Sequence, residues 1–337
     1  MGKYKLINNV LGWVTFAISS IVYLMTMEPT ASFWDCGEFI SSAYKLEVGH
    51  PPGAPFFMLT ANLFTQFASD PSQVAVMVNS MSALFSGLTI LFLFWSITHL
   101  ARRILVNEGE EISNSQLITI MGSGLVGALA YTFSDTFWFS AVEGEVYAYS
   151  SLFTAVVFWL ILKWEAVADK PHADRWMVLI AYLMGLSIGV HLLNLLCIPA
   201  IVLVYYYKKY PNPTLKGTFV ALFISFAIIA VMMYGVVQGL VEVCGWFELL
   251  FVNGMGMPYN SGVFAYVVVL LGVIAWAIYE TMTSNPNKAR MNIAFILSVT
   301  LIGIPFIGSG YVIGILLIAA LTAYLFLSKR TSIEVMN

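Results

Sequence analysis

The sequence predicts an all-α polytopic membrane protein with about ten transmembrane helices and short interfacial helices in its first extracytoplasmic loop. Of the 337 residues, 60% are hydrophobic and only 10% are charged, and the mean hydropathy is +0.85. Soluble domains carry about 25% charged residues. Apolar runs that approach the roughly 20 residues needed to cross a bilayer core recur along the chain. They cover approximately 9–27, 76–99, 115–133, 145–163, 176–191, 193–207, 217–240, 262–279, 291–307 and 310–327.

The first apolar run follows a basic N-terminus, as in a signal peptide, but it is longer than a usual signal core and lacks a clear cleavage site. We therefore expect it to be retained as the first span of a single transmembrane domain over 1–337. An even number of spans places both termini on the same side of the membrane.

Lys and Arg orient these spans. With the N-terminus in the cytoplasm, every Lys and Arg except Lys45 falls on the cytoplasmic side, as the positive-inside rule requires. We therefore predict a multi-pass protein of the cell (inner) membrane with both termini cytoplasmic. The main extracytoplasmic loops are then 28–75, 134–144 and 241–261, and acidic residues dominate them.

The first of these loops contains WDCGEFISSAYK. If 35–46 is helical, Asp35, Glu38, Ser42 and Lys45 share one face, with apolar residues opposite. This pattern is typical of an amphipathic helix in the membrane interface. The alternative is structural: Asp35 as N-cap and Glu38 three residues later match a capping box.

The same loop continues as VGHPPGAPFF. His50 precedes two prolines, which favours an extended conformation at a chain reversal, and a second interfacial helix is expected to end near Phe67. An exposed turn histidine is often idle, but the HPPG setting makes His50 a candidate binding residue.

The second loop and the connection near 191 supply further polar candidates. Glu143 and Glu145 are two residues apart, so on a helix they do not share a face. One could point into a cavity while the other complements the positive helix N-terminus. Tyr147 would share a face with Glu143. His191 and Asn194 either contribute to a site or satisfy a hydrogen bond between helices.

Two features that the sequence lacks restrict the range of possible functions. No Asp, Glu, Lys or Arg lies near the centre of an expected span, whereas ion-coupled transporters and pumps usually place ionisable groups there. The three cysteines lack a CxxC spacing, which indicates neither a zinc site nor a disulfide framework. Chemistry is therefore expected at the outer surface.

The stretches FWDCGEFISSAYKLEVGHPPGAPFF and FWFSAVEGEVYAYS resemble glycosyltransferase family 117, the protein O-mannosyltransferase-like enzymes of the GT-C superfamily, which includes bacterial members of a domain of unknown function. The resemblance extends over about 8–262. It implies a GT-C-like fold and transfer of a sugar, with mannose as one candidate, from a polyprenyl-phosphate donor on the extracytoplasmic face. The acceptor would be a hydroxyl, such as protein Ser or Thr. It also implies that Asp35 is the catalytic base, with Glu38 beside it, and that Glu143 and Glu145 belong to the site.

The chemistry of such a transfer is consistent with these residues. A positioned carboxylate takes the proton of a weakly nucleophilic hydroxyl, and a cation stabilises the departing lipid phosphate. Lys45, His50 or His191 could supply that cation, or acidic side chains could hold Mg²⁺ or Mn²⁺. We expect the following residues to bind substrate: Lys45, His50, Glu143, Glu145, Tyr147, His191 and Asn194.

The expected partners are thus the lipid-linked donor, a protein or other hydroxyl acceptor and the bilayer, without nucleic acid. Two alternatives remain: a membrane transporter or lipid flippase, and a non-catalytic membrane scaffold. Many family members continue beyond the position that corresponds to residue 337, which favours the scaffold alternative. We therefore expect a short form or a fragment of a longer architecture.

Overall fold

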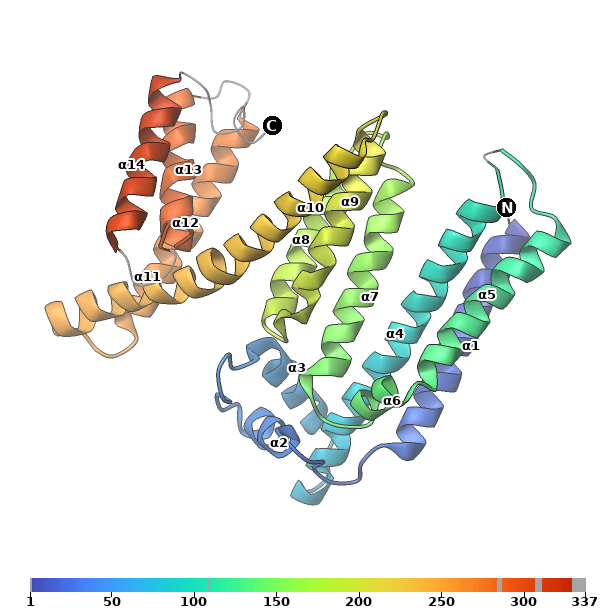
Figure 1. The fold of residues 1–337 in the computed structure, drawn as a ribbon. Helices are drawn as coiled ribbons and strands as arrows, with labels where there is room; N and C mark the ends of the chain where they lie inside the picture. Colours follow the sequence, from blue (N-terminus) through green and yellow to red (C-terminus); the bar gives the residue numbers. More distant parts are fainter. Residues whose placement is uncertain (1, 108, 284–286, 307–310, 329–337) are drawn as a thin grey trace. The chain divides into compact units, whose positions relative to one another are not determined.

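The computed structural model describes residues 2–107, 109–283, 287–306 and 311–328. Within these ranges every regular element is helical and no strand occurs, which confirms the all-α prediction. The chain divides into two compact units, Met1–Leu222 (unit 1) and Phe223–Asn337 (unit 2), coloured along the sequence in Figure 1. The single domain expected over 1–337 stays a prediction.

Unit 1 contains the helices that position the candidate site. In chain order they are α1 (Gly2–Thr26), α2 (Cys36–Lys45), α3 (Pro55–Thr65), η1 (Pro71–Gln73), α4 (Val74–Leu105), α5 (Asn114–Thr132), α6 (Asp135–Ala141), α7 (Val146–Glu165), α8 (Asp174–Ile188), η2 (Leu192–Cys197), α9 (Ile198–Lys209) and the first half of α10 (Leu215–Ala230).

The long helix α4 lies at the centre of unit 1, packed against α1, α5 and α7, while α8 and α9 pack against α7. Small residues allow the close approaches. A Cβ on Gly12 would lie 2.6 Å from Nε1 of Trp95, and one on Gly124 would lie 2.6 Å from Cγ2 of Thr98. Small residues at such contacts are typical of membrane helix pairs.

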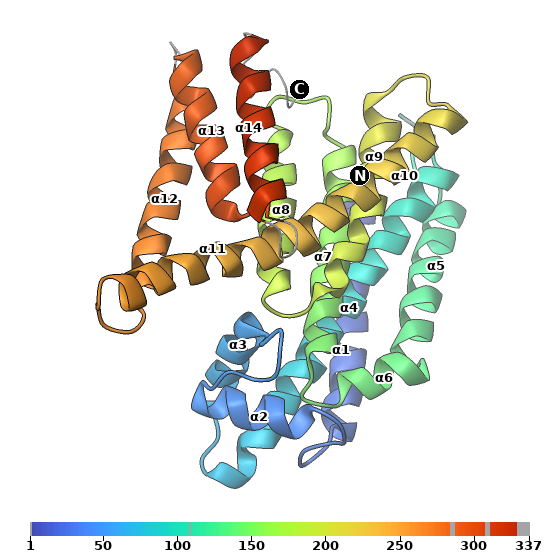
Figure 2. The same ribbon diagram turned by 60° about the vertical axis from the view of Figure 1, so that its left-hand side comes forward.

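The short helices α2, α3 and α6 lie together at one end of this bundle, and the N-terminus lies at the other end (Figures 1 and 2). Phe39 and Ile40 of α2 and Phe57 of α3 pack with Val78 of α4 in one buried cluster. The backbone N–H groups of Phe56 and Phe57 also donate to the carbonyl oxygen of Gly189, at 2.6 and 3.2 Å. The short helices predicted within 28–75 are therefore present, and their position along a membrane surface stays a prediction.

Unit 2 consists of helices around a smaller core. They are the rest of α10, η3 (Val231–Val237), α11 (Gln238–Glu248), η4 (Leu249–Gly254), α12 (Ser261–Met282), α13 (Lys288–Ile302) and α14 (Tyr311–Leu327). Val243, Tyr266 and Phe306 form its buried cluster. The Glu248 carboxylate accepts the backbone N–H groups of Asn260 and Val263, so it satisfies free donors at the start of α12.

Six helices of the described residues are long and apolar enough to cross a membrane, or up to seven if the bent pair α5 and α6, which meet at 68°, forms one span. The predicted number of about ten is not confirmed. The helices over the expected spans 176–191 and 291–307 have 15 residues each, or about 22 Å, against a hydrocarbon core of about 30 Å.

Most of the expected loop over 241–261 is helical, and its position outside the membrane stays a prediction. Helix continues through α11 and η4 to Gly254, in a segment that contains Glu242 and Glu248 but no proline. Only the Gly- and Pro-containing residues 255–260 form the connection.

Candidate functional site

Helix α2 carries the first group of site residues. Its buried side consists of Cys36, Phe39, Ile40, Ser42 and Ala43, while Glu38 and Lys45 lie on the other side. Two residues of α2 depart from the expected amphipathic pattern. Ser42, expected on the charged face, is buried, and Tyr44, expected among the apolar residues of the opposite face, is 44% exposed. A helix repeats every 3.6 residues, so Ser42, three positions after Phe39, turns inward with it.

Asp35 directly precedes α2, but its side chain makes no capping hydrogen bond. The structure therefore does not support the capping-box alternative. Instead, the Asp35 carboxylate, whose side chain is 55% exposed, lies 3.9 Å from Nε2 of His50.

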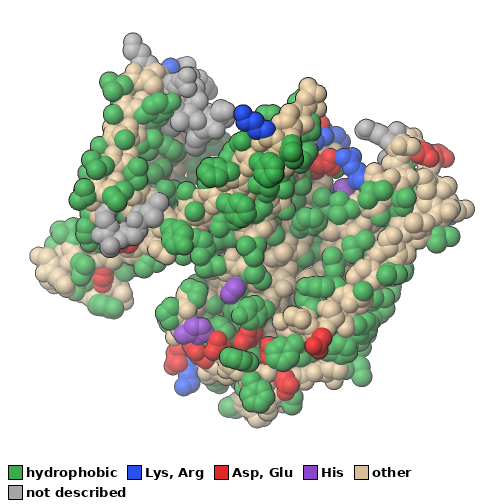
Figure 3. Space-filling view, viewed as in Figure 1, with side chains coloured by type: hydrophobic (Ala, Val, Ile, Leu, Met, Phe, Trp, Pro, Cys, Tyr) green, Lys and Arg blue, Asp and Glu red, His purple; other side chains and the backbone are tan. Residues whose placement is uncertain are grey.

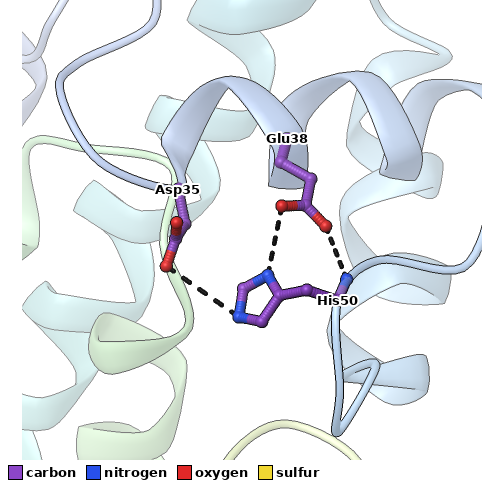
Figure 4. Close-up of side chains that lie close together, drawn as sticks. All are labelled: Asp35, Glu38 and His50. Atoms are coloured by element: carbon purple, nitrogen blue, oxygen red, sulfur yellow. Dashed lines mark hydrogen bonds and ion pairs between the residues drawn. The ribbon is translucent and has the colours of Figure 1, made fainter.

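Asp35, Glu38 and His50 form the exposed triad of the site (Figure 4). Glu38 Oε2 lies 3.1 Å from Nδ1 of His50, and Glu38 Oε1 accepts the His50 backbone N–H at 2.5 Å. This backbone hydrogen bond, followed by the one from the imidazole, lowers the pKa of Glu38. A carboxylate oxygen can only accept, so Nδ1 of His50 donates to Glu38, and Nε2 is the ring nitrogen that lies toward Asp35.

Cys36, Glu143 and Glu145 form a second group, the buried triad, with exposed fractions of 0%, 4% and 7%. Their ligand atoms all lie within 4.8 Å of one another. Both glutamates are buried, although on a helix they would not share a face. The reason is that residues 142–145 are not helical: a turn closed by the hydrogen bond from Glu145 N–H to the Glu143 carbonyl, at 2.9 Å, joins α6 to α7.

Burial sets the protonation of this triad. It raises the pKa of Glu145 to about 7, with further contributions from the negative charges of Glu143 and Asp35. Burial also raises the pKa of Glu143, which hydrogen-bonds to Ser32 and Cys36, and that of the Cys36 thiol. Burial in a medium of low dielectric disfavours the charged form of all three groups.

The two triads are connected through the backbone. The N–H of Asp35 donates to the Glu145 carboxyl group, and Cys36 is the next residue in the chain.

Asn79 on α4 was missed by the sequence argument although it supports this arrangement. It is fully buried, and its amide donates to the carbonyl oxygens of Glu28 and Thr30 at 2.6 and 3.0 Å. Glu28 N–H in turn donates to the carbonyl oxygen of Val142 at 3.0 Å. A single Asn inside an apolar run was the available signal.

The remaining candidate residues lie around these triads. Tyr147 packs against the His191 ring with centroids 5.3 Å apart, and Nδ1 of His191 accepts the Leu193 N–H at 3.1 Å. Asn194 is fully buried and donates to Oγ of Ser187 at 2.9 Å, which favours its role as a hydrogen-bonding partner between helices. Lys45 is exposed and makes no hydrogen bond or ion pair within the part of the chain that the structure describes.

Either triad has the composition of a cation site. The exposed triad offers two carboxylates and an imidazole, and the buried triad offers two carboxylates and a thiol. Oxygen ligands suit Mg²⁺ or Mn²⁺, so the exposed triad fits these ions better than the thiol-containing one.

A cavity of about 610 Å³ lies among the helices of unit 1, within the size range of small-molecule sites. Its lining comes from α4, α5, α7 and η2 and includes Leu93, Ile97, Tyr131, Ser151, Phe158 and Leu196. Ser151 is six residues after Glu145 on α7, about 9 Å along the helix axis. The lining is mainly apolar, so this cavity suits a hydrocarbon chain.

Figure 3 shows how charge is distributed over unit 1: acidic side chains and histidines gather at the end that carries α2 and α3. The triads are thus part of an acidic surface at one end of a bundle of apolar helices.

Comparison with known proteins places this surface in a family context. The family model described as the protein O-mannosyl-transferase TMEM260 N-terminal domain matches residues 35–214. Protein O-mannosyl-transferase tmem260 of Dictyostelium discoideum is 27% identical over 185 residues, which are 53% of this chain and 20% of that protein. Protein O-mannosyl-transferase TMEM260 of Mus musculus is 28% identical over 174 residues, or 51% of this chain and 22% of that protein. No solved structure matches.

The chain thus covers only about a fifth of the length of these relatives. The matched range begins at Asp35 and includes all residues of both triads.

Proposed function

Since the chain belongs to the family of the protein O-mannosyl-transferase TMEM260 N-terminal domain, we propose that it is a membrane glycosyltransferase that moves a mannose from a polyprenyl-phosphate donor to a protein hydroxyl. In this proposal the fold is GT-C-like, and the reaction takes place on the extracytoplasmic face of the cell (inner) membrane. The relatives carry the name O-mannosyl-transferase; the donor, the acceptor and the face of the membrane are part of the proposal.

The observation that carries the proposal is the free carboxylate of Asp35. It makes no capping hydrogen bond, it is exposed, and it lies beside the His50 imidazole that Glu38 holds. A general base needs these properties, because it must reach the proton of an incoming hydroxyl.

In the proposed reaction the acceptor oxygen forms a bond to the anomeric carbon while the bond from that carbon to the phosphate oxygen breaks. The hydroxyl proton passes to Asp35, and the electron pair leaves with the polyprenyl phosphate. His50 protonated on Nε2 supplies a positive charge close to the site, and Glu38 stabilises that imidazolium through Nδ1. A divalent cation in the exposed triad would serve the same end.

The apolar cavity supports the lipid part of the proposal. Two of its lining residues, Tyr131 and Ser151, lie near the ends of α5 and α7 that adjoin the acidic surface. A polyprenyl chain in this cavity would keep its phosphate and sugar at the level of the triads.

The test compares Asp35→Asn with the parent, using the purified full chain, a polyprenyl-phosphate mannose and an acceptor peptide rich in Ser and Thr. Loss of a general base lowers the rate by about 10²–10⁴-fold, measured as release of polyprenyl phosphate. Because Asp35 provides no cap, the thermal midpoint is expected to stay unchanged.

Glu47→Gln is the matched control, since Glu47 is an exposed acid of the same loop. It is expected to keep full activity. Transfer by Asp35→Asn at the parental rate would exclude Asp35 as the base, and no transfer by the parent would contradict the proposed function of this chain.

A further inference from the structure

Basic side chains from three helices converge at the end of unit 1 opposite the acidic surface. We define the basic cluster as Lys5 of α1, Arg102 of α4 and Lys163 of α7. Helix α4 packs against both α1 and α7. Arg102 lies over the ring of Tyr4, the residue before Lys5, and Arg103 pairs with Glu165, two residues after Lys163. The cluster therefore joins side chains that are far apart in sequence.

Arg102 and Lys163 of the basic cluster contact aromatic rings instead of pairing with a carboxylate. Arg102 lies over the ring of Tyr4, 5.0 Å from its centroid, and Lys163 lies over the ring of Trp159 at 4.7 Å. Nearby basic residues do have acidic partners within the described part of unit 1: Arg103 pairs with Glu165 at 2.6 Å and Lys208 with Asp169 at 2.8 Å. No ion pair of a cluster residue occurs in that part of the chain.

Like charges at the same end of a helix bundle repel one another, and the repulsion grows when water is partly excluded. A bound anion removes this penalty. Aromatic residues such as Tyr4 and Trp159 prefer the headgroup level of a membrane, and basic pockets between transmembrane helices bind lipid headgroups at that level.

We propose that the basic cluster binds the phosphate group of an anionic phospholipid. This inference is independent of the glycosyltransferase proposal, because it concerns the other end of the bundle. The apolar side chains next to the cluster favour a lipid over free phosphate: Leu6 is 66% exposed, Val10, one turn further along α1, is 52% exposed, and Ile104 on α4 is 83% exposed. They offer a surface on which acyl chains can pack.

The test uses the full chain in phosphatidylcholine nanodiscs that contain increasing fractions of phosphatidylglycerol. Retained phosphatidylglycerol is counted by native mass spectrometry, and the thermal midpoint is followed in parallel. The parent is expected to retain the anionic lipid and to melt at higher temperature with it. Lys5→Gln/Arg102→Gln/Lys163→Gln is expected to weaken retention by about fivefold per side chain, or on the order of 100-fold in total.

The matched control is Lys170→Gln/Arg175→Gln/Lys216→Gln, which removes the same charge from exposed residues outside the cluster. It is expected to retain the lipid within about threefold of the parent. Equal losses in both triple variants would show a general surface potential and overturn the proposal.

Two further measurements test the lipid assignment: competition by inorganic phosphate and a single-residue variant. Inorganic phosphate at millimolar concentration is expected to leave lipid retention unchanged; full displacement would show a free-phosphate site and overturn the lipid assignment. If the triple variant fails to fold, Lys5→Gln alone alters one exposed side chain and is expected to lower retention about fivefold. Parental retention by this single variant would also refute the proposal.

Discussion

The backbone N–H of Asp35 donates to the carboxyl group of Glu145, yet the surroundings of the two carboxyl groups differ. The Asp35 side chain is more than half exposed, whereas Glu145 is buried against Glu143 and Cys36. Unlike environments for neighbouring carboxyl groups are a common way to give them separate roles. Here they suggest a base at Asp35 and a proton-retaining support at Glu145.

The buried Glu145 predicts a pH dependence of stability. Burial raises its folded-state pKa from 4.5 to about 7, so between these values the folded chain binds more protons than the unfolded chain. The contribution of Glu145 to the free energy of unfolding is therefore fully present below about pH 4.5 and falls as the pH rises to about 7. Above that pH this contribution no longer changes. Glu145→Gln should remove part of this fall, on the order of 2 kcal/mol.

The measurement is the thermal midpoint of the parent and of Glu145→Gln at pH 5 and pH 8, with Glu47→Gln as the exposed control. The parent is expected to lose more stability between these pH values than Glu145→Gln, and Glu47→Gln should follow the parent. Parallel curves for all three proteins would show that Glu145 ionises normally in the folded state.

At the scale of elements, the turn between α6 and α7 decides whether the two triads form. It needs a residue without a side chain at Gly144, because a Cβ there would lie 2.9 Å from Oδ1 of Asn79, 3.0 Å from Cγ1 of Val78 and 3.1 Å from Cγ1 of Ile40. These atoms belong to α2 and α4, so the turn is packed between the two helices.

Gly144→Ala is therefore expected to destabilise the chain by about 1–3 kcal/mol, the usual cost of overpacking. It should also reduce transfer activity, because α2 would shift relative to Glu143 and Glu145. Gly122→Ala on α5 is the control, since its added methyl group meets no atom within 4 Å; chemical denaturation or thermal melting distinguishes the two. A Gly144→Ala protein as stable as Gly122→Ala would contradict the packing described here.

For the whole molecule, the testable property is the orientation of the bundle. We predict that the end with α2 and α3 faces outward and that the end with the basic cluster faces the cytoplasm. Ser41 is the suitable probe on α2, because it is exposed whereas Ser42 is buried.

In a variant without native cysteines, Ser41→Cys should react with a membrane-impermeant thiol reagent in intact cells. Lys170→Cys, an exposed position near the other end, should react only after permeabilisation. The reverse pattern would invert the topology and place the proposed site in the cytoplasm.

The sequence by itself determined the all-α class and the presence of short helices in 28–75, whereas the outward position of the acidic segments stays a prediction. These follow from composition and from local patterns: apolar runs, the residues between them and the spacing of charges along one helix. The same local reasoning was less reliable for the number of spans, because an apolar run shows that a segment avoids water but not how long its helix is.

Only the tertiary structure decided how the site residues meet. His50 contacts Glu38 across a reversal of the chain, and Cys36 meets Glu143 and Glu145, which are more than a hundred residues away. It also showed that Asp35 is not a cap, that Asn194 is a hydrogen-bonding partner inside the bundle, and that Asn79 holds the first loop. Contacts of this kind depend on how helices pack, and packing depends on the shapes of side chains that are distant in sequence.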